Sequence, residues 1–207
     1  VSQSQVHPEI GYTFATGLRT TLRQDPDIIM VGEIRDAETA KLAIQAALTG
    51  HLVLSTIHTN SALGVIPRLV DMGVDPYLIA PTLVLAVAQR LVKKICPDAG
   101  DPQPINESTR LMFEDQFSDL PAEARPKIPK MLYEAKGTPD CPSGVRGRIA
   151  VFEMLAMTHE LEHQVLKDAS EDTVHDIARS QGMLTMKEDA IIKTFKRRIP
   201  FEEVNSL

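Results

Sequence analysis

The sequence predicts an α/β protein, and the prediction rests on three features of residues 25–60. Two short apolar runs, Ile28–Val31 and Leu52–Leu54, flank an alanine-rich stretch of helical character. A strand, a helix and a second strand within this span form a βαβ unit, which implies parallel strands and a right-handed crossover. Polar residues follow both runs, at Gly32–Asp36 and Ser55–Asn60. Ligands bind at the carboxyl ends of such strands, so a functional site is expected there.

Local start and stop signals define the elements of the first half. Thr13 and Asp36 are positioned to cap two helices, while Asp25-Pro26 and Gly50 end them. The run Ile28–Val31 is continuously apolar and rich in β-branched residues, as a strand buried on both faces would be. The elements expected here are an edge-strand tail at Val1–Val6, helix Phe14–Gln24, strand Ile28–Val31, helix Ala37–Thr49 and strand Leu52–Thr56.

The second half is interrupted by a proline-rich region. Three segments are expected: a core over residues 1–95, an inserted subdomain over 96–147, and a return strand with a small helical domain over 148–207. The return strand is expected to pair antiparallel with the last strand of the core. The elements expected in order are helices Ser61–Met72 and Tyr77–Ala88, strand Gln89–Ile95, helix Glu107–Gln116, strand Arg148–Leu155, and helices Thr158–Lys167, Asp172–Gln181 and Thr185–Phe195.

Composition excludes several classes of function. The formal net charge of -6 argues against nucleic-acid binding, which needs a basic footprint. No apolar run approaches the roughly 20 residues that span a bilayer, so direct membrane insertion is not expected. The absence of both a signal sequence and an initial Met leads us to expect a piece of a longer protein. Two cysteines are too few for a secreted disulfide scaffold and favour a cytoplasmic protein.

Glu33 and His58 are the candidate chemical groups at the two strand ends. A carboxylate such as Glu33 can polarise a water or organise a cation, although a salt bridge with Arg35 is the simpler interpretation. His58 lies among hydroxyl and amide side chains that can hydrogen-bond a phosphate; the alternative is a structural histidine. His51 is expected to be structural because it opens its strand at the opposite end. Neither His51 nor His58 has the spacing of a metal-binding H-E-x-x-H helix.

Three stretches resemble a known family. LRQDPDIIMVGEIRDAETA is similar to the atypical Walker B region of the secretion-ATPase superfamily, and TGHLVLSTIHTNSA is similar to its histidine box. Together with IPRLVDMGVDPYLIAPTLVLAVAQRLVKKIC, they resemble the ATPases that power type IV pilus assembly and type II secretion. The resemblance runs from about Val6 to Phe195, nearly the whole chain.

The resemblance implies a partial RecA-like P-loop NTPase core that works as a cytoplasmic homo-hexamer with ATP and Mg²⁺. It implies docking on an inner-membrane platform protein. Glu33 matches the glutamate that activates the attacking water, and His58 matches the histidine near the γ-phosphate. The segment around Arg90 matches one that connects the motor to the C-terminal domain. The expected supporting residues of the nucleotide site are Asp25, Asp27, Gly32, Arg35, Asp36, Thr56 and Arg90.

One departure from the family pattern concerns the phosphate cradle. No glycine in the chain begins a G-x-x-x-x-G-K-[ST] sequence, and the family's Asp box is also absent. Both are expected upstream of Val1, so this chain alone is expected to bind ATP very weakly. The alternative is a non-catalytic docking module in which the P-loop is truly lost.

A second departure concerns zinc. Many family members carry two C-x-x-C pairs in the insertion, but here Cys96 and Cys141 each stand alone. Asp98 and Asp140 are candidate substitute ligands, yet zinc is not expected. The loop of the insertion is instead interpreted as held by packing and prolines. A disulfide between the two cysteines is disfavoured by a reducing cytoplasm.

The length of the insertion favours pilus assembly or type II secretion over a retraction motor. Pilus assembly and type II secretion are not separated by the sequence. Retraction-type, conjugative and other type IV secretion ATPases are the more distant alternatives.

Overall fold

The computed structural model describes residues 2–97 and 99–207, and the chain forms two compact units. Unit 1 comprises the chain up to Ala86 together with Ala156–His175, and unit 2 comprises Val87–Leu155 and Asp176–Leu207. These boundaries do not coincide with the three segments expected from the sequence. Val1, where the expected edge-strand tail begins, lies outside the described residues, and residues 2–6 form neither helix nor strand.

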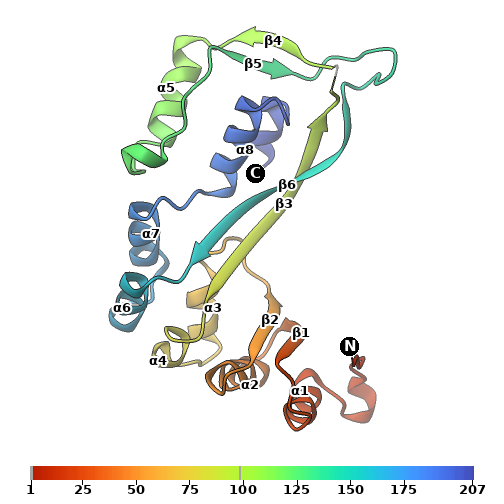
Figure 1. The fold of residues 1–207 in the computed structure, drawn as a ribbon, viewed down its shortest axis with the longest axis vertical. Helices are drawn as coiled ribbons and strands as arrows, with labels where there is room; N and C mark the ends of the chain where they lie inside the picture. The colour runs from red at the N-terminus through yellow and green to blue at the C-terminus, as the bar shows by residue number, and fades with distance from the viewer. Residues whose placement is uncertain (1, 98) are drawn as a thin grey trace. The chain divides into compact units, whose positions relative to one another are not determined.

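Figure 1 shows the elements in chain order. Those before the second unit are η1 (Pro8–Ile10), α1 (Phe14–Leu22), β1 (Ile28–Ile34), α2 (Ala37–Leu48), β2 (Leu52–Ile57), α3 (Val65–Asp71) and α4 (Pro76–Ile79). They are followed by β3 (Leu85–Ile95), β4 (Asp101–Pro104), α5 (Glu107–Gln116), η2 (Ala122–Ala124), β5 (Met131–Glu134) and β6 (Val145–Ala156). The chain ends with α6 (His159–Lys167), α7 (Glu171–Ser180), α8 (Met186–Phe195) and η3 (Phe201–Ser206).

The predicted βαβ unit is confirmed in unit 1. Strands β1 and β2 are parallel, with Ile28 opposite Leu52 and Val31 opposite Ser55. The register becomes irregular between Val31 and Ile34. Helix α2 connects the strands, and its buried alanines, among them Ala40, pack into the same apolar core as β1. The predicted caps are also present, because Thr13 and Asp36 accept hydrogen bonds from backbone N–H groups in the first turns of α1 and α2.

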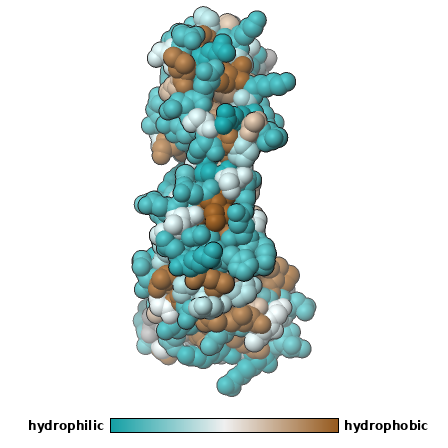
Figure 2. All heavy atoms as spheres, turned by 90° about the vertical axis from the view of Figure 1, so that its left-hand side faces the viewer, coloured by the Kyte–Doolittle hydropathy of each residue, from teal (hydrophilic) through white to brown (hydrophobic). Residues whose placement is uncertain are grey.

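One face of this strand pair is exposed, contrary to expectation. Ile29 and Val31 of β1 are buried, but the side chains between them alternate outward, and Met30 is 75% exposed. In β2, Leu52 and Leu54 are exposed as well. On another side of the molecule, Figure 2 shows scattered apolar patches among hydrophilic side chains. The continuous apolar run therefore has the alternating burial of a strand packed on one side.

Two helix predictions were wrong at their boundaries. Helix α3 begins at Val65, because the Ser61 hydroxyl accepts a hydrogen bond from the Gly64 N–H (3.0 Å) and holds a turn before it. The helix expected over Tyr77–Ala88 is only the single turn α4, and strand β3 begins at Leu85. Pro81 explains the stop, since a proline lacks the N–H needed for the next helical hydrogen bond, although Ala80 before it keeps helical dihedral angles (φ −50°, ψ −51°).

Strands β3 and β6 form an antiparallel ribbon, as predicted for the return strand. Hydrogen bonds at its two ends, from Met157 N to Val84 O and from Cys96 N to Gly144 O (both 3.0 Å), fix the antiparallel direction. A second antiparallel pair, β4 with β5, was not predicted. Its strand β4 contains two prolines, which are tolerated at the edge of a sheet and hide a strand from pattern analysis.

The core of unit 2 joins residues that lie far apart in sequence. Phe113 of α5 is fully buried and makes edge-to-face contacts with Phe195 and Phe201, with ring centroids 5.1 and 5.6 Å apart. Leu132 of β5 and Ile191 of α8 belong to the same core. The proline-rich region therefore shares one core with α8 and η3.

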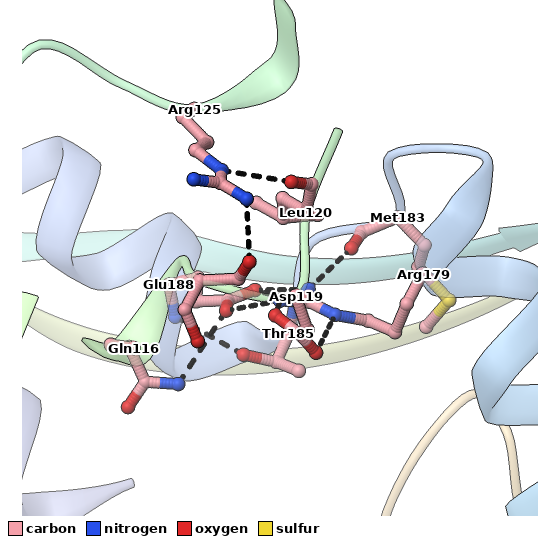
Figure 3. A network of polar contacts seen from close by, with 9 residues as sticks. Gln116, Asp119, Leu120, Arg125, Arg179, Met183, Thr185 and Glu188 are labelled. Carbon is pink, nitrogen blue, oxygen red and sulfur yellow. Dashed lines mark hydrogen bonds and ion pairs between the residues drawn. The ribbon is translucent and has the colours of Figure 1, made fainter. Parts of the chain in front are cut away.

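A buried ion network lies in the same unit (Figure 3). The Arg179 guanidinium binds both carboxylate oxygens of Glu188, at 2.6 and 2.7 Å, and also binds Asp119 (Nε–Oδ2, 2.8 Å). The side chain of Glu188 is completely buried, and that of Arg179 is almost so. Burial by itself lowers the pKa of Arg179, but the hydrogen bonds to Asp119 and Glu188 raise it above its ordinary value. The arginine is therefore held in its charged form.

The two cysteines of unit 2 form a disulfide. Cys96 and Cys141 are both buried, and their Sγ atoms are bonded. A disulfide was not expected because a reducing cytoplasm disfavours it, but the fold brings the two cysteines together. A backbone hydrogen bond from Cys96 to Gly144 and an isolated bridge between Thr138 and Cys141 hold both sides in place. Asp98, one of the candidate zinc ligands, lies outside the described residues.

Replacing Arg179 tests the ion network. We expect Arg179→Met to lower the free energy of unfolding by about 3–5 kcal/mol, because Glu188 would remain buried without its cation. Urea denaturation followed by circular dichroism measures this. Arg110→Met is the matched control, since Arg110 pairs with Glu114 on the exposed surface of α5 and its loss should leave stability unchanged. Equal stability of both variants would contradict the assigned role.

Removing the disulfide tests its contribution to the fold. We expect the Cys96→Ser/Cys141→Ser double variant to lose about 2–4 kcal/mol of unfolding free energy, because the bond restricts the unfolded chain. Urea denaturation with and without a reductant provides the measurement. The double variant should be insensitive to reductant, and two freely titrating thiols in the unfolded wild-type chain would show that the bond is absent.

Candidate functional site

The predicted site residues Glu33 and His58 meet at the carboxyl ends of β1 and β2. Glu33 is the next-to-last residue of β1, and His58 directly follows β2. The Nε2 atom of His58 lies 3.3 Å from Oε2 of Glu33. The same oxygen also accepts a hydrogen bond from Nε of Arg35. The expected salt bridge with Arg35 is therefore present, and Glu33 also faces the histidine. A role of Glu33 toward a water or a cation stays a prediction.

The side chains of His58 and Arg35 are more exposed to solvent than that of Glu33. The Glu33 side chain is only 20% exposed, whereas those of His58 and Arg35 are 79% and 66% exposed. The carboxylate is therefore fixed at the strand end by neighbouring groups. The imidazole remains accessible from solvent and is free to contact a ligand.

Gly32 and Thr56 connect the two strand ends. The Thr56 hydroxyl donates a hydrogen bond of 2.8 Å to the carbonyl oxygen of Gly32. A side chain at Gly32 would come into ordinary contact with the Phe14 ring of α1, 3.4 Å away. The Thr56 hydroxyl thus reinforces the strand pair where the register becomes irregular.

Two other predicted residues make backbone contacts, and a third, Asp25, has an unusual backbone angle. Asp36 caps α2 by accepting hydrogen bonds from the N–H and hydroxyl of Thr39, at 2.8 and 3.0 Å. The carbonyl oxygen of Asp27 accepts a hydrogen bond from the N–H of Leu52 (3.0 Å), which aligns the starts of the two strands. Asp25 is exposed and adopts a positive φ of 52°. The structure therefore gives Asp27 and Asp36 roles in positioning the strands and helix that carry the site.

The remaining candidates lie elsewhere. Arg90 belongs to β3 in unit 2 and donates to the carbonyl oxygen of Gln89 (3.3 Å). The Nδ1 atom of His51 lies 2.9 Å from the carbonyl oxygen of Ala46 at the end of α2, the structural setting expected for it.

Glu33 and His58 together offer a proton acceptor and a hydrogen-bond donor for an anionic ligand. A fixed carboxylate can accept a proton from water, and an accessible imidazole can donate a hydrogen bond. Within residues 2–97 and 99–207, no three His, Cys, Asp or Glu side chains form a metal-binding group. The helices of the same residues include none with the length and apolar character needed to cross a membrane.

Comparison with known sequences supports the family resemblance. The family described as "Type II/IV secretion system protein" matches residues 1–206. The type II secretion system ATPase E of Vibrio cholerae is 42% identical over 205 residues, which are 99% of this chain and 39% of that protein. The type IV pilus assembly ATPase PilB of Thermus thermophilus is 42% identical over 206 residues, 99% of this chain and 22% of that protein.

Comparison with solved structures confirms the RecA-like α/β fold. The ATPase DotB of Legionella pneumophila matches with a TM-score of 0.64 and 26% identity, over 98% of this chain and 44% of DotB. The pilus retraction motor PilT with bound ADP matches with a TM-score of 0.61 over 94% of this chain and 43% of PilT; at 24% identity it supports the fold alone. The chain spans less than half the length of these relatives. Its sequence and fold together show that the chain belongs to the type II/IV secretion system protein family.

Proposed function

We propose that this chain forms part of a subunit of an ATP-hydrolysing motor that powers type II protein secretion or type IV pilus assembly. The observation that carries the proposal is the contact of Glu33 with His58 at the carboxyl edge of β1 and β2. The names and the identity of the two ATPases from V. cholerae and T. thermophilus support it. A retraction-type or other type II/IV secretion motor is the second candidate, supported by the breadth of the matched family.

In the proposed reaction, MgATP supplies the phosphoryl group and the charge-neutralising cation. The Glu33 carboxylate orients a water molecule and accepts its proton. Its salt bridge with Arg35 limits the rotamers open to the carboxylate and so favours one orientation. The exposed His58 imidazole hydrogen-bonds a phosphate oxygen and, through its contact with Glu33, senses whether that phosphate is present.

The phosphate cradle lies outside this sequence in the proposal. The 207 residues contain no G-x-x-x-x-G-K-[ST] sequence that could hold the phosphates. The exposed apolar side chains of Ile28, Met30 and Leu52 support a further covering layer on that face of the sheet. Parallel sheets are normally covered on both faces, so the remaining part of a longer subunit is the proposed cover.

The proposed motor is a homo-hexamer that docks on an inner-membrane platform protein from the cytoplasm. Its support is membership of a family whose named relatives belong to secretion and pilus machines. The net charge of -6 supports protein partners over nucleic acid. The alternative of a non-catalytic docking module would share these partners but would not hydrolyse ATP.

A chimera tests the catalytic proposal. The matching segment of the V. cholerae ATPase E is replaced by this chain, which supplies the missing part of the site. We expect Glu33→Gln to lower kcat for ATP hydrolysis by at least about 100-fold, because the amide cannot accept the proton from water. The Kd for MgATP should change little. Steady-state phosphate release and nucleotide titration provide the two measurements.

The matched control for this experiment is Glu38→Gln. Glu38 is an exposed glutamate in the first turn of α2 and pairs with Arg19. Its replacement should leave both kcat and Kd unchanged. Full activity of the Glu33→Gln chimera would remove Glu33 from the catalytic step and favour the docking module.

The isolated chain provides a simpler test of the missing cradle. We expect the 207-residue chain to show no saturable MgATP binding below millimolar concentration and no turnover, because it lacks the loop that holds the phosphates. Isothermal titration calorimetry and phosphate release measure both properties. Tight binding or family-like turnover by this chain would show that its own residues form a complete nucleotide site.

A further inference from the structure

Helix α6 carries a sequence pattern that the functional site does not use. Residues 159–163 read His-Glu-Leu-Glu-His, the H-E-x-x-H spacing that His51 and His58 lack. On a helix, residues four apart lie on the same face, one turn from each other. The pattern therefore places the imidazoles of His159 and His163 side by side, as metal-binding helices do.

The structure places the two imidazoles in direct contact. The Nε2 atoms of His159 and His163 lie 3.2 Å apart, and the ring centroids are separated by 4.5 Å. Two Zn–N bonds of about 2.0–2.1 Å whose nitrogen ends are this far apart enclose an angle of about 100° at the metal. That angle lies between the square-planar and tetrahedral values.

We propose that α6 binds one divalent transition-metal ion, with Zn²⁺ as the probe, through Nε2 of His159 and His163. Imidazole pairs select Zn²⁺, Cu²⁺ and Ni²⁺ over Mg²⁺ and Ca²⁺, which prefer oxygen ligands. The site is open, because the His159 side chain is 84% exposed and His163 is also exposed.

The surroundings of the pair favour a cation. Oε2 of Glu162 lies 3.5 Å from Nδ1 of His159, the nitrogen that faces away from the proposed ion. A carboxylate in this position orients a metal-binding imidazole. The start of a helix carries partial positive charge, which opposes a cation, but Glu160 and Glu162 in the first turn of α6 offset it.

The proposed ion has two protein ligands in this chain. Among the described residues, no third His, Cys, Asp or Glu completes a group around them. Water then occupies the other positions, which distinguishes the site from a closed structural zinc site and from a protease centre with three protein ligands. The expected consequence is local: the ion bridges two turns and stabilises α6.

Calorimetric titration of the full 207-residue chain with ZnCl₂ tests the proposal. The chain must be free of an affinity tag and treated with a chelator beforehand. We expect one Zn²⁺ per chain, and His159→Ala or His163→Ala should each weaken binding at least tenfold. His7→Ala is the matched control, since His7 is an exposed histidine outside α6, and it should bind as the wild-type chain does. MgCl₂ should give no binding.

A thermal readout separates this site from zinc bound elsewhere. Zn²⁺ should raise the Tm of unit 1 in the wild-type chain and in His7→Ala, reversibly on addition of a chelator, but in neither α6 variant. Circular dichroism of the variants before titration shows whether they retain their helices. Absence of Zn²⁺ binding, or equal binding in the wild-type chain and both α6 variants, would overturn the proposal. The 3.2 Å contact would then be an N–H···N hydrogen bond between the rings.

Discussion

The parallel pairing of β1 with β2 is the constraint on which the candidate site depends. Helix α2 returns the chain to the start of β1, so both strands run in the same direction and end at the same edge. Small residues of α2 such as Ala40 and Ala43 let the helix lie close to the sheet. A slip of one residue would reverse the faces of β2 and separate His58 from Glu33. The contact between Glu33 and His58 therefore depends on the register in which β1 pairs with β2.

Unit 2 is stabilised in a different way. Its core draws on segments separated by many residues, and Phe113 at its centre contacts two aromatic rings from the C-terminal part. Arg179 connects the same segments by binding Asp119 and Glu188. The disulfide adds a covalent connection across a separation of 45 residues. Apolar packing, ion pairing and a covalent bond thus each hold the proline-rich region to the rest of the unit.

The family explains why the site is so sparse. Its members include ATPases that are much longer than this chain, which covers 39% of the V. cholerae protein. Glu33 and His58 lie together as expected, although β1 continues to Ile34, three residues past the predicted end, so that Glu33 lies inside the strand. Arg35 and Thr56 also lie at this edge, whereas Asp36 and Asp27 contact the backbone. The H-E-x-x-H pattern of α6 is present in the sequence, and the structure shows that its two histidines are in contact.

The sequence by itself determined the features that depend on neighbouring residues. Caps such as Thr13, Asp36 and Thr185 set the starts of helices, and the apolar runs located β1 and β2, because these signals act within a few residues. Only the tertiary structure decided the pairing of β4 with β5, the shared core of unit 2, the Cys96–Cys141 bond and the exposed face of β1. Each of these depends on what lies opposite a residue in space, and local patterns carry no record of such distant neighbours.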